Sequence, residues 1–194
     1  INNYFLTQGF KNIFFYLHHY IVYHTKFTLF AMSIAQEFEK ANTHYSSNFT
    51  KGDLPLPPAR KVAVVICMDA RIDPAASLGL TEGDAHVIRN AGGRASDALR
   101  SVIISQRLLG TREIVVVHHT DCGMLTFSDN DLRGIVAKET GHNVDHFAFL
   151  PFGDLEKSVK DDVEFFKRNP LVLDVPVTGY IYDVKSGAIN KVDS

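Results

Sequence analysis

Short apolar runs alternate with longer amphipathic stretches along most of this chain. Runs that are almost unbroken in apolar residues are typical of strands covered on both faces, and they are predicted at 61–66, 85–88 and 113–117. Apolar residues that recur every three or four positions indicate helices, which are expected at 33–43, 97–109, 130–138 and 154–167. A terminal hairpin is expected at 178–192. This alternation predicts an α/β fold with a mostly parallel central β-sheet flanked by helices.

The ends of several helices are also visible in the sequence. Asp73 can cap a short helix that has Pro74 at its first position, where a missing backbone N–H is not needed. Ser96 or Asp97 is expected to cap the long helix that follows, because short polar side chains accept hydrogen bonds from the first free amides. Gly110 is expected to end that helix, since glycine readily adopts the left-handed conformation found after a last turn.

Both cysteines of the chain directly follow predicted strands. Cys67 opens the run CMDAR at 67–71, and Cys122 closes the run HTDC at 119–122. Loops at the carboxyl ends of parallel strands carry the functional groups of many α/β proteins. Two thiolates and the imidazole of His119 suit zinc and leave a fourth tetrahedral position for water or a carboxylate. The alternative of two buried structural cysteines stays open, whereas a redox pair is disfavoured because the chain has no Cys-x-x-Cys run.

Asp69 and Arg71 form the second candidate group of the first loop. Side chains two apart in an extended stretch lie on the same side, so the two can pair. The guanidinium of Arg71 would then keep Asp69 ionised. An ionised carboxylate beside a metal-bound water can accept a hydrogen bond from it and orient it. Asp69 could alternatively take the fourth metal position, and the plainest alternative is a loop salt bridge worth little.

The neighbours of these residues have less specific patterns. His118 is expected to point away from His119 and to be structural. Asp121 is expected to orient His119 or, more simply, to cap backbone amides. Gly92 and Gly93 bring backbone amides close to a small ligand in one interpretation, and form only a tight turn in the other.

The composition is that of one soluble globular domain. The chain has 194 residues, of which 45% are apolar and 22% charged. A net charge of -2 without a cluster of Lys or Arg argues against nucleic acid or an anionic membrane as partner. Two cysteines are too few for a disulfide scaffold, so a cytoplasmic location is expected. Residues 32–194 are expected to form a single zinc-binding α/β domain.

The first 31 residues differ from the rest in composition. They hold ten of the 21 aromatic residues and no Asp or Glu, and their only Lys or Arg residues are Lys11 and Lys26. Histidines and Lys26 interrupt the apolar runs, so no membrane span is expected. A mitochondrial leader is the less favoured alternative to a cytoplasmic location, because such leaders carry arginine. The segment is interpreted either as an amphipathic helix that docks on the domain or on a second subunit, or as an upstream extension of a protein that begins at Met32.

Taken together, these motifs resemble those of the β-class carbonic anhydrases. The CxDxR run at 67–71 and the HxxC run at 119–122 match the family signature, and the run RNAG at 89–92 matches the family's turn after the second strand. The resemblance begins near Met32 and extends to the C-terminus. Through the runs at 83–92 and 118–127, it is strongest to a short, minor subgroup that also includes carbonyl sulfide hydrolases.

The resemblance implies a zinc lyase, a carbonate dehydratase in which Cys67, His119 and Cys122 hold zinc. A zinc-bound hydroxide would reversibly hydrate carbon dioxide to bicarbonate. Asp69 and Arg71 would be catalytic, and they would either orient the hydroxide or release Asp69 onto the metal in a resting state. The family also implies a homodimer or a tetramer.

Two alternatives stay open within this resemblance. A carbonyl sulfide hydrolase would use the same site to convert another small linear molecule, carbonyl sulfide, and water to carbon dioxide and hydrogen sulfide. A non-catalytic zinc-binding protein would keep Asp69 permanently on the metal. The chain contains no Trp, so the tryptophan-containing bicarbonate pocket through which some bacterial members inhibit themselves cannot be complete.

Overall fold

The computed structural model of the protein describes residues 33–193. These residues belong to two units that divide between Gly52 and Asp53. The predicted extension at 1–31 lies outside the described residues. That extension and the single domain at 32–194 therefore stay predictions.

In the first unit, helix α2 (Ile34–Ser47) confirms the helix predicted at 33–43 and continues for one more turn. Its start is a reciprocal capping box. The Ser33 hydroxyl accepts a hydrogen bond from the Gln36 amide at 3.3 Å, and the Gln36 side chain accepts one from the Ser33 amide at 2.9 Å. The helix has no buried residue, and its apolar Ile34 and Phe38 are 61% and 68% exposed.

In the second unit, residues 53–193 build a sheet of five strands in the order β2-β1-β3-β4-β5. The strands are β1 (Val62–Cys67), β2 (Ala85–Asn90), β3 (Glu113–His119), β4 (Val177–Tyr182) and β5 (Ile189–Val192). All pairs are parallel except β4 with β5, which form the predicted terminal hairpin. The structure thus confirms the predicted α/β class with a mostly parallel sheet.

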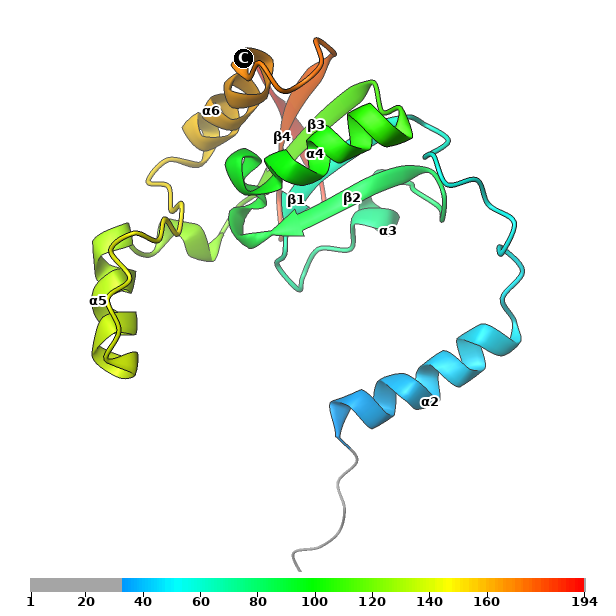
Figure 1. Ribbon diagram of the computed structural model, residues 1–194, viewed down its shortest axis with the longest axis horizontal. Coiled ribbons are helices and arrows are strands. Elements are labelled where there is room, and N and C mark those ends of the chain that lie inside the picture. Colours follow the sequence, from blue (N-terminus) through cyan, green and yellow to red (C-terminus); the bar gives the residue numbers. More distant parts are fainter. Residues whose placement is uncertain (1–32, 194) are drawn as a thin grey trace, which may run out of the picture. The chain divides into compact units, whose positions relative to one another are not determined.

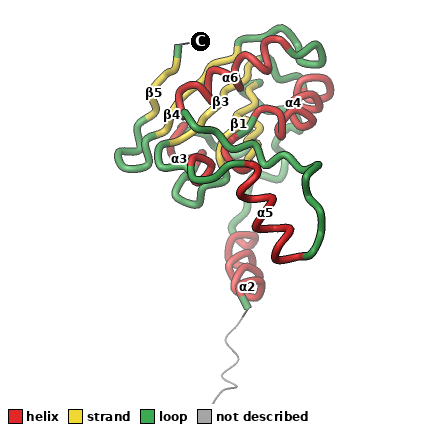
Figure 2. The backbone as a smooth tube through the Cα atoms, turned by 90° about the vertical axis from the view of Figure 1, so that its left-hand side faces the viewer, coloured by secondary structure: helices red, strands yellow, loops and turns green. Residues whose placement is uncertain are grey.

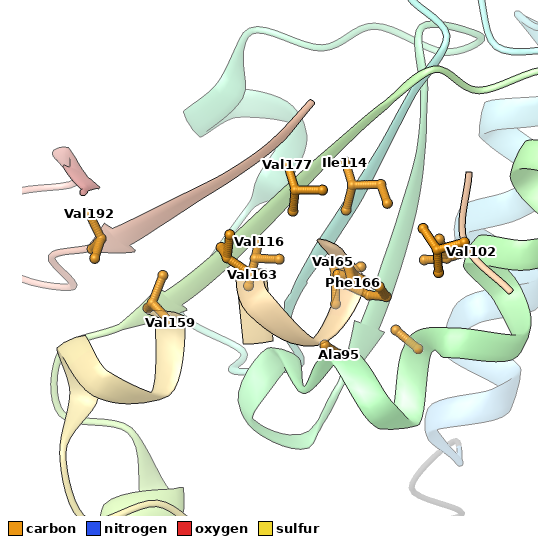
Figure 3. Packing of buried hydrophobic residues seen from close by; sticks show 12 residues of the cluster. Val65, Ala95, Val102, Ile114, Val116, Val159, Val163, Phe166, Val177 and Val192 are labelled. Atoms are coloured by element: carbon orange, nitrogen blue, oxygen red, sulfur yellow. The ribbon is translucent and has the colours of Figure 1, made fainter. Parts of the chain in front are cut away.

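Helices α4 (Ala95–Leu109) and α6 (Leu155–Arg168) cover one face of the sheet (Figures 1 and 2). The apolar cluster between them and the strands consists almost entirely of aliphatic side chains. Figure 3 shows Val65 and Val116 of the central strands facing Val102 of α4 and Val163 and Phe166 of α6. These five residues are at most 1% exposed, so this side of the sheet holds the main core of the unit.

The other face of the sheet is covered in part by helix α3 (Pro74–Leu78) and by the loops that follow β1 and β3. Asp73 caps α3 as predicted, because its carboxylate accepts hydrogen bonds from the amides of Ala75 and Ala76. The buried cluster on this face includes both cysteines. The chemistry-bearing loops therefore belong to this second, smaller core.

Helix α5 (Asp129–Thr140) has no buried residue. The segment that follows it runs back along it: Arg133 Nε donates to the Phe147 carbonyl at 2.9 Å, and the Phe149 amide donates to Asp129 at 2.7 Å. Gly141 ends α5 in the left-handed conformation, and Gly110 ends α4 in the same way, as predicted. Among residues 33–193, no helix is both long and apolar enough to cross a bilayer.

The predicted cap of α4 is wrong. The helix begins at Ala95, two residues earlier than a cap at Ser96 allows, and the preceding Arg94 makes no side-chain cap bond. Instead, the Asp162 carboxylate of α6 accepts the Ala95 amide at 3.0 Å. The first turn of α4 is thus satisfied from a neighbouring helix, and a local polar side chain is not needed.

Gly179 in β4 permits the close approach of α6, because a Cβ at this position would overlap the side chain of Val159. We expect Gly179→Ala to lower the free energy of unfolding by about 1–3 kcal/mol, as overpacked cores do. Gly134→Ala is the matched control, since that glycine lies in α5 with no atom near the added methyl and alanine is the better helix former. Denaturant unfolding of both variants measures the difference, and equal stabilities would contradict the packing argument.

Candidate metal centre

The two cysteine loops meet because their strands are neighbours. Cys67 ends β1 and His119 ends β3, and the strands pair in parallel with Ile66 opposite Val117. Parallel strands in register end at the same edge of a sheet, so the loops after them lie side by side. Cys122 follows within the second loop, directly before a short 3-10 helix, η2 (Gly123–Leu125).

The structure brings Cys67, His119 and Cys122 into one buried cluster. Their sulfur atoms and an imidazole nitrogen all lie within 4.8 Å of one another, and the residues are 4%, 0% and 3% exposed. Both cysteines are free. Tetrahedral zinc with bonds of about 2.0–2.3 Å separates its ligand atoms by roughly 3.3–3.8 Å. Small side-chain rotations would therefore close the cluster on an ion.

The orientation of His119 fits a metal ligand. Its Nδ1 lies 2.9 Å from the Thr120 carbonyl oxygen. A carbonyl can only accept, so Nδ1 carries a proton, and Nε2 has a free lone pair whenever the imidazole is neutral. Nε2 is buried and has no hydrogen-bond partner among the described residues. An unpartnered imidazole nitrogen beside two sulfurs is what a thiolate and imidazole metal site requires, and the Thr120 carbonyl supplies the usual outer partner of such a ligand.

The thiols are prepared for metal binding to different degrees. A hydrogen bond from the Cys122 thiol lowers the pKa of Cys67 to about 4 despite burial, with further contributions from His119 and from the amides of Asp69 and Gly92. The same hydrogen bond, together with burial, raises the pKa of Cys122 above its ordinary value. Burial disfavours a charge on His119, but the Cys67 thiolate outweighs this effect and raises the His119 pKa. The metal-free cluster thus holds protons where a metal would bind.

Asp69 and Arg71 form the pair that the sequence predicts. Arg71 donates to the Asp69 carboxylate from Nε at 2.9 Å, from Nη2 at 2.8 Å and from its own amide at 2.9 Å. These hydrogen bonds hold the pKa of Asp69 well below its usual range, so the carboxylate is ionised. Asp69 Oδ2 lies 3.7 Å from His119 Nε2. An ionised acceptor is therefore held at the edge of the ligand cluster.

The expected roles of Asp121 are wrong. It neither orients His119, which is held by the Thr120 carbonyl, nor caps backbone amides of its loop. Its carboxylate lies 2.7 Å from Arg71 Nη1, and its carbonyl accepts from Arg71 Nη2 at 3.0 Å. Sequence reasoning missed this contact because it joins two loops that are 50 positions apart.

Arg89 is another functional residue that sequence reasoning did not single out. Its Nε donates to the Cys67 carbonyl at 3.0 Å and its Nη2 to the Asp69 carbonyl at 2.7 Å. The guanidinium thus holds the backbone of the CxDxR loop from the neighbouring strand β2. Its place in the run RNAG at 89–92 is the signal that could have indicated it.

Gly92 and Gly93, predicted to lie near a substrate or in a tight turn, pack directly against the cysteine loop. Both have positive φ angles, of 79° and 68°. A Cβ at Gly93 would lie 3.0 Å from the Cys67 amide nitrogen and 3.0 Å from the Val117 carbonyl oxygen. The Gly92 amide is also one of the groups that lower the pKa of Cys67. The turn therefore packs against Cys67 and helps to stabilise its thiolate. A contact of these glycines with a substrate stays a prediction.

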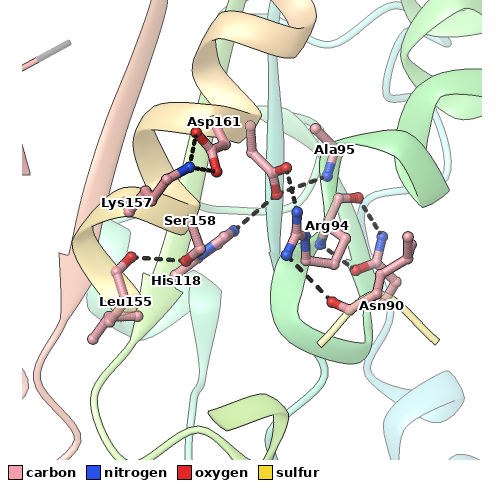
Figure 4. A network of polar contacts seen from close by, with 10 residues as sticks. Asn90, Arg94, Ala95, His118, Leu155, Lys157, Ser158 and Asp161 are labelled. Carbon is pink, nitrogen blue, oxygen red and sulfur yellow. Dashed lines mark hydrogen bonds and ion pairs between the residues drawn. The ribbon is translucent and has the colours of Figure 1, made fainter. Parts of the chain in front are cut away.

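His118 points away from the cluster, as the alternation along a strand predicts. Figure 4 shows it on the helical side of the sheet, where its Nδ1 lies 2.7 Å from the Ser158 hydroxyl and its Nε2 3.2 Å from Asp162. Asp162 also pairs with Arg94 at 3.0 Å and accepts the Ala95 amide. All four side chains are at most 14% exposed, so this network ties β3, α4 and α6 together inside the core.

The comparisons with known proteins agree with this geometry. A family model described as carbonic anhydrase matches residues 62–148, a range that contains the whole cluster. Beta-carbonic anhydrase 1 of Mycobacterium tuberculosis is 44% identical over 163 residues, which cover 83% of this chain and 99% of that relative. The chain belongs to the β-carbonic anhydrase family. The resemblance seen in the sequence motifs is thereby confirmed.

Family members with two different names are similar to this chain. The structure of carbonic anhydrase from Glaciozyma antarctica has 54% sequence identity and a TM-score of 0.80, and the match covers 84% of this chain and 100% of that one. Carbon disulfide hydrolase of Acidianus sp. (strain A1-3) is 35% identical over 161 residues, which cover 70% of this chain and 79% of that relative. Relatives of this chain thus bear the names of enzymes that act on different substrates.

We expect zinc binding to this site to depend steeply on pH. Cys67 is ionised above about pH 5 because its pKa is about 4, whereas the raised pKa of Cys122 keeps a proton that zinc must displace. The apparent zinc affinity should therefore rise with pH, by about tenfold per unit for each displaced proton. Competition with a coloured chelator across neutral pH measures the slope. A pH-independent affinity would show that both thiols are already ionised in the metal-free protein.

Proposed function

We propose that the protein is a zinc-dependent carbonic anhydrase that reversibly hydrates carbon dioxide to bicarbonate. The observation that carries this proposal is the buried cluster of Cys67, His119 and Cys122 with an ionised Asp69 at its edge. The donor set suits zinc because two sulfurs and one imidazole nitrogen match its preferred ligands. Among residues 33–193 the cluster has three members, which would leave one tetrahedral position for the reacting water.

Bound zinc would supply a nucleophile at moderate pH by lowering the pKa of a water molecule. Two thiolates would neutralise the charge of the ion, so the water gains less acidity here than it would among three histidines. Asp69 compensates in part, because its ionised carboxylate can accept a hydrogen bond from the water and orient the oxygen lone pair. Arg71 keeps that carboxylate ionised and prevents it from turning freely.

Relatives that match over almost their whole length support carbon dioxide as the substrate. They bear carbonic anhydrase names and are 44–54% identical to this chain. The carbon disulfide hydrolase relative is less similar and less completely covered. The contacts between Asp69 and Arg71 also favour a catalytic site over a permanently closed one, since they hold Asp69 on the arginine.

Hydrolysis of a sulfur analogue is the second candidate function. The similarity to a carbon disulfide hydrolase favours it, and carbonyl sulfide and carbon disulfide are linear molecules like carbon dioxide. Attack of water on the carbon of carbonyl sulfide would release hydrogen sulfide and carbon dioxide. The same ligands and the same Asp69 would serve both reactions.

The deciding experiment compares zinc-loaded protein on carbon dioxide, carbonyl sulfide and carbon disulfide at one mildly alkaline pH. We expect fast carbon dioxide hydration and slow release of hydrogen sulfide. Cys67→Ser is the control, because loss of a ligand should remove zinc and activity together. Efficient sulfide release with weak hydration would replace the first function by the second, and inactivity of fully zinc-loaded protein on all three would contradict both.

We expect Asp69→Asn to keep zinc but to lower turnover by about a hundredfold or more, the usual contribution of a positioned proton acceptor. The amide has a similar shape but cannot accept a proton and pairs only weakly with Arg71. Asp161→Asn is the matched control, because Asp161 is also a carboxylate paired with a cation but lies on the outside of α6. Zinc analysis and stopped-flow hydration give the two readouts. Near-native turnover of Asp69→Asn would remove Asp69 from the mechanism.

We further propose that the protein acts as a homodimer or tetramer. Apolar side chains on the surface of the second unit support this, since Val87, Leu108, Phe147 and Leu171 are 41–77% exposed. Light scattering after gel filtration gives the oligomeric state, and a monomer would contradict the proposal. The cytoplasmic location stays a prediction from composition.

A further inference from the structure

Arg71 lies between two carboxylates from different loops. Asp69, in the loop after β1, accepts from the Nε side of the guanidinium at 2.8–2.9 Å. Asp121, in the loop after β3, accepts from Nη1 at 2.7 Å through its side chain and from Nη2 at 3.0 Å through its carbonyl. Four of the five side-chain N–H groups of Arg71 therefore point at oxygen atoms.

The contact with Asp121 supplies something that Asp69 cannot. Asp69 and Arg71 belong to the same short loop, so a bond between them does not fix either residue relative to His119 and Cys122. Asp121 lies between those two residues in the sequence. Its contact with Arg71 thus connects the carboxylate that faces the reacting water to the loop that holds two of the three candidate ligands.

The backbone of Asp121 is arranged for this contact. Its φ angle is 55°, a left-handed conformation that Asp and Asn adopt more readily than most residues. In this conformation the carbonyl and the carboxylate of one residue both reach the same guanidinium. Asp69 holds one edge of the guanidinium with two oxygen atoms, and the two acceptors of Asp121 hold the adjacent edge, so the group is fixed from both loops.

The exposure of these side chains argues that the contact matters for orientation more than for stability. The side chains of Arg71 and Asp121 are 47% and 74% exposed, and exposed ion pairs contribute little to folding. A half-exposed arginine has a long side chain, and its guanidinium is mobile unless both of its edges are held. The side chain of Asp69 is only 17% exposed, and Arg71 is its hydrogen-bond partner. The mobility of Arg71 therefore decides how firmly the Asp69 carboxylate is oriented toward the ligand cluster.

We propose that Asp121 is a positioning residue that fixes the guanidinium of Arg71 and, through it, the carboxylate of Asp69 relative to His119 and Cys122. The effect on turnover rests on the proposed function, but the effect on Arg71 does not. Removing the Asp121 carboxylate should loosen Arg71, leave the ligand set intact and slow the reaction. A purely structural loop salt bridge would leave Arg71 and turnover unchanged.

The test uses two substitutions of Asp121 and one control. Asp121→Gly removes the carboxylate and tolerates the left-handed backbone. Asp121→Asn keeps that backbone preference and an oxygen that can still accept from Arg71 Nη1. Asp161→Asn removes a paired surface carboxylate from α6 and should change nothing near the site. Zinc content is measured first, and all variants should match the native protein.

The first readout is the mobility of Arg71 itself. In the zinc-loaded, ¹⁵N-labelled protein, the heteronuclear Overhauser effect at Arg71 Nε reports fast motion of the guanidinium, and its signal is assigned by its loss in Arg71→Lys. We expect a rigid value in the native protein and in Asp161→Asn, a clear fall in Asp121→Gly and an intermediate value in Asp121→Asn. An unchanged value in Asp121→Gly would overturn the proposal, because Asp69 alone would then hold Arg71.

The second readout is carbon dioxide hydration. We expect kcat of Asp121→Gly to fall by about tenfold, as for other residues that orient groups around a metal, with less loss in Asp121→Asn. In an Arg71→Lys background, Asp121→Gly should lower kcat much less, since Asp121 acts on Asp69 only through Arg71. A mobile Arg71 with native kcat, or additive losses, would overturn the proposal. Inactivity of the native protein would instead contradict the proposed function, and the Arg71 mobility would still decide whether Asp121 holds the guanidinium.

Discussion

The parallel pairing of β1 with β3 is the constraint on which the rest of the site depends. Its register, with Ile66 opposite Val117, sets the two cysteine loops at one edge of the sheet. Side chains buried on both faces stabilise that register, because a slip by one residue would exchange the side chains that pack on the two faces. Ligands that are 55 positions apart in the chain thus meet at one edge of the sheet.

Strand β2 completes the arrangement from the other side of β1. Arg89 holds two carbonyls of the CxDxR loop, and Gly93 lies so close to the Cys67 amide that only glycine fits. Buried parallel strands leave little freedom at their ends, so these contacts turn a flexible loop into one defined conformation. Three strands therefore shape a cluster that takes its ligands from only two of them.

The sequence predicted those parts of the protein that depend on local pattern. Apolar runs indicated the strands, Asp73 and Gly110 indicated helix ends, and the two loop motifs indicated the cluster and the Asp69 pair. Contacts between distant segments could not be predicted. The cap of α4 is a carboxylate 67 positions away, and the partner of Asp121 lies in another loop. In both cases the short-range pattern suggested a local hydrogen bond, while a partner brought close by the tertiary fold accepted or donated instead.

The hydrogen bond that sets the tautomer of His119 has an evolutionary consequence. Its acceptor is the main-chain carbonyl of residue 120, which every amino acid carries. No single substitution at position 120 can delete that acceptor, in contrast to sites where a carboxylate side chain plays this part. The Thr120 side chain is consequently available for a different task, and here it accepts the amide of Val184. The tautomer of this imidazole is therefore independent of which side chain stands at position 120, and that side chain can make a separate contact.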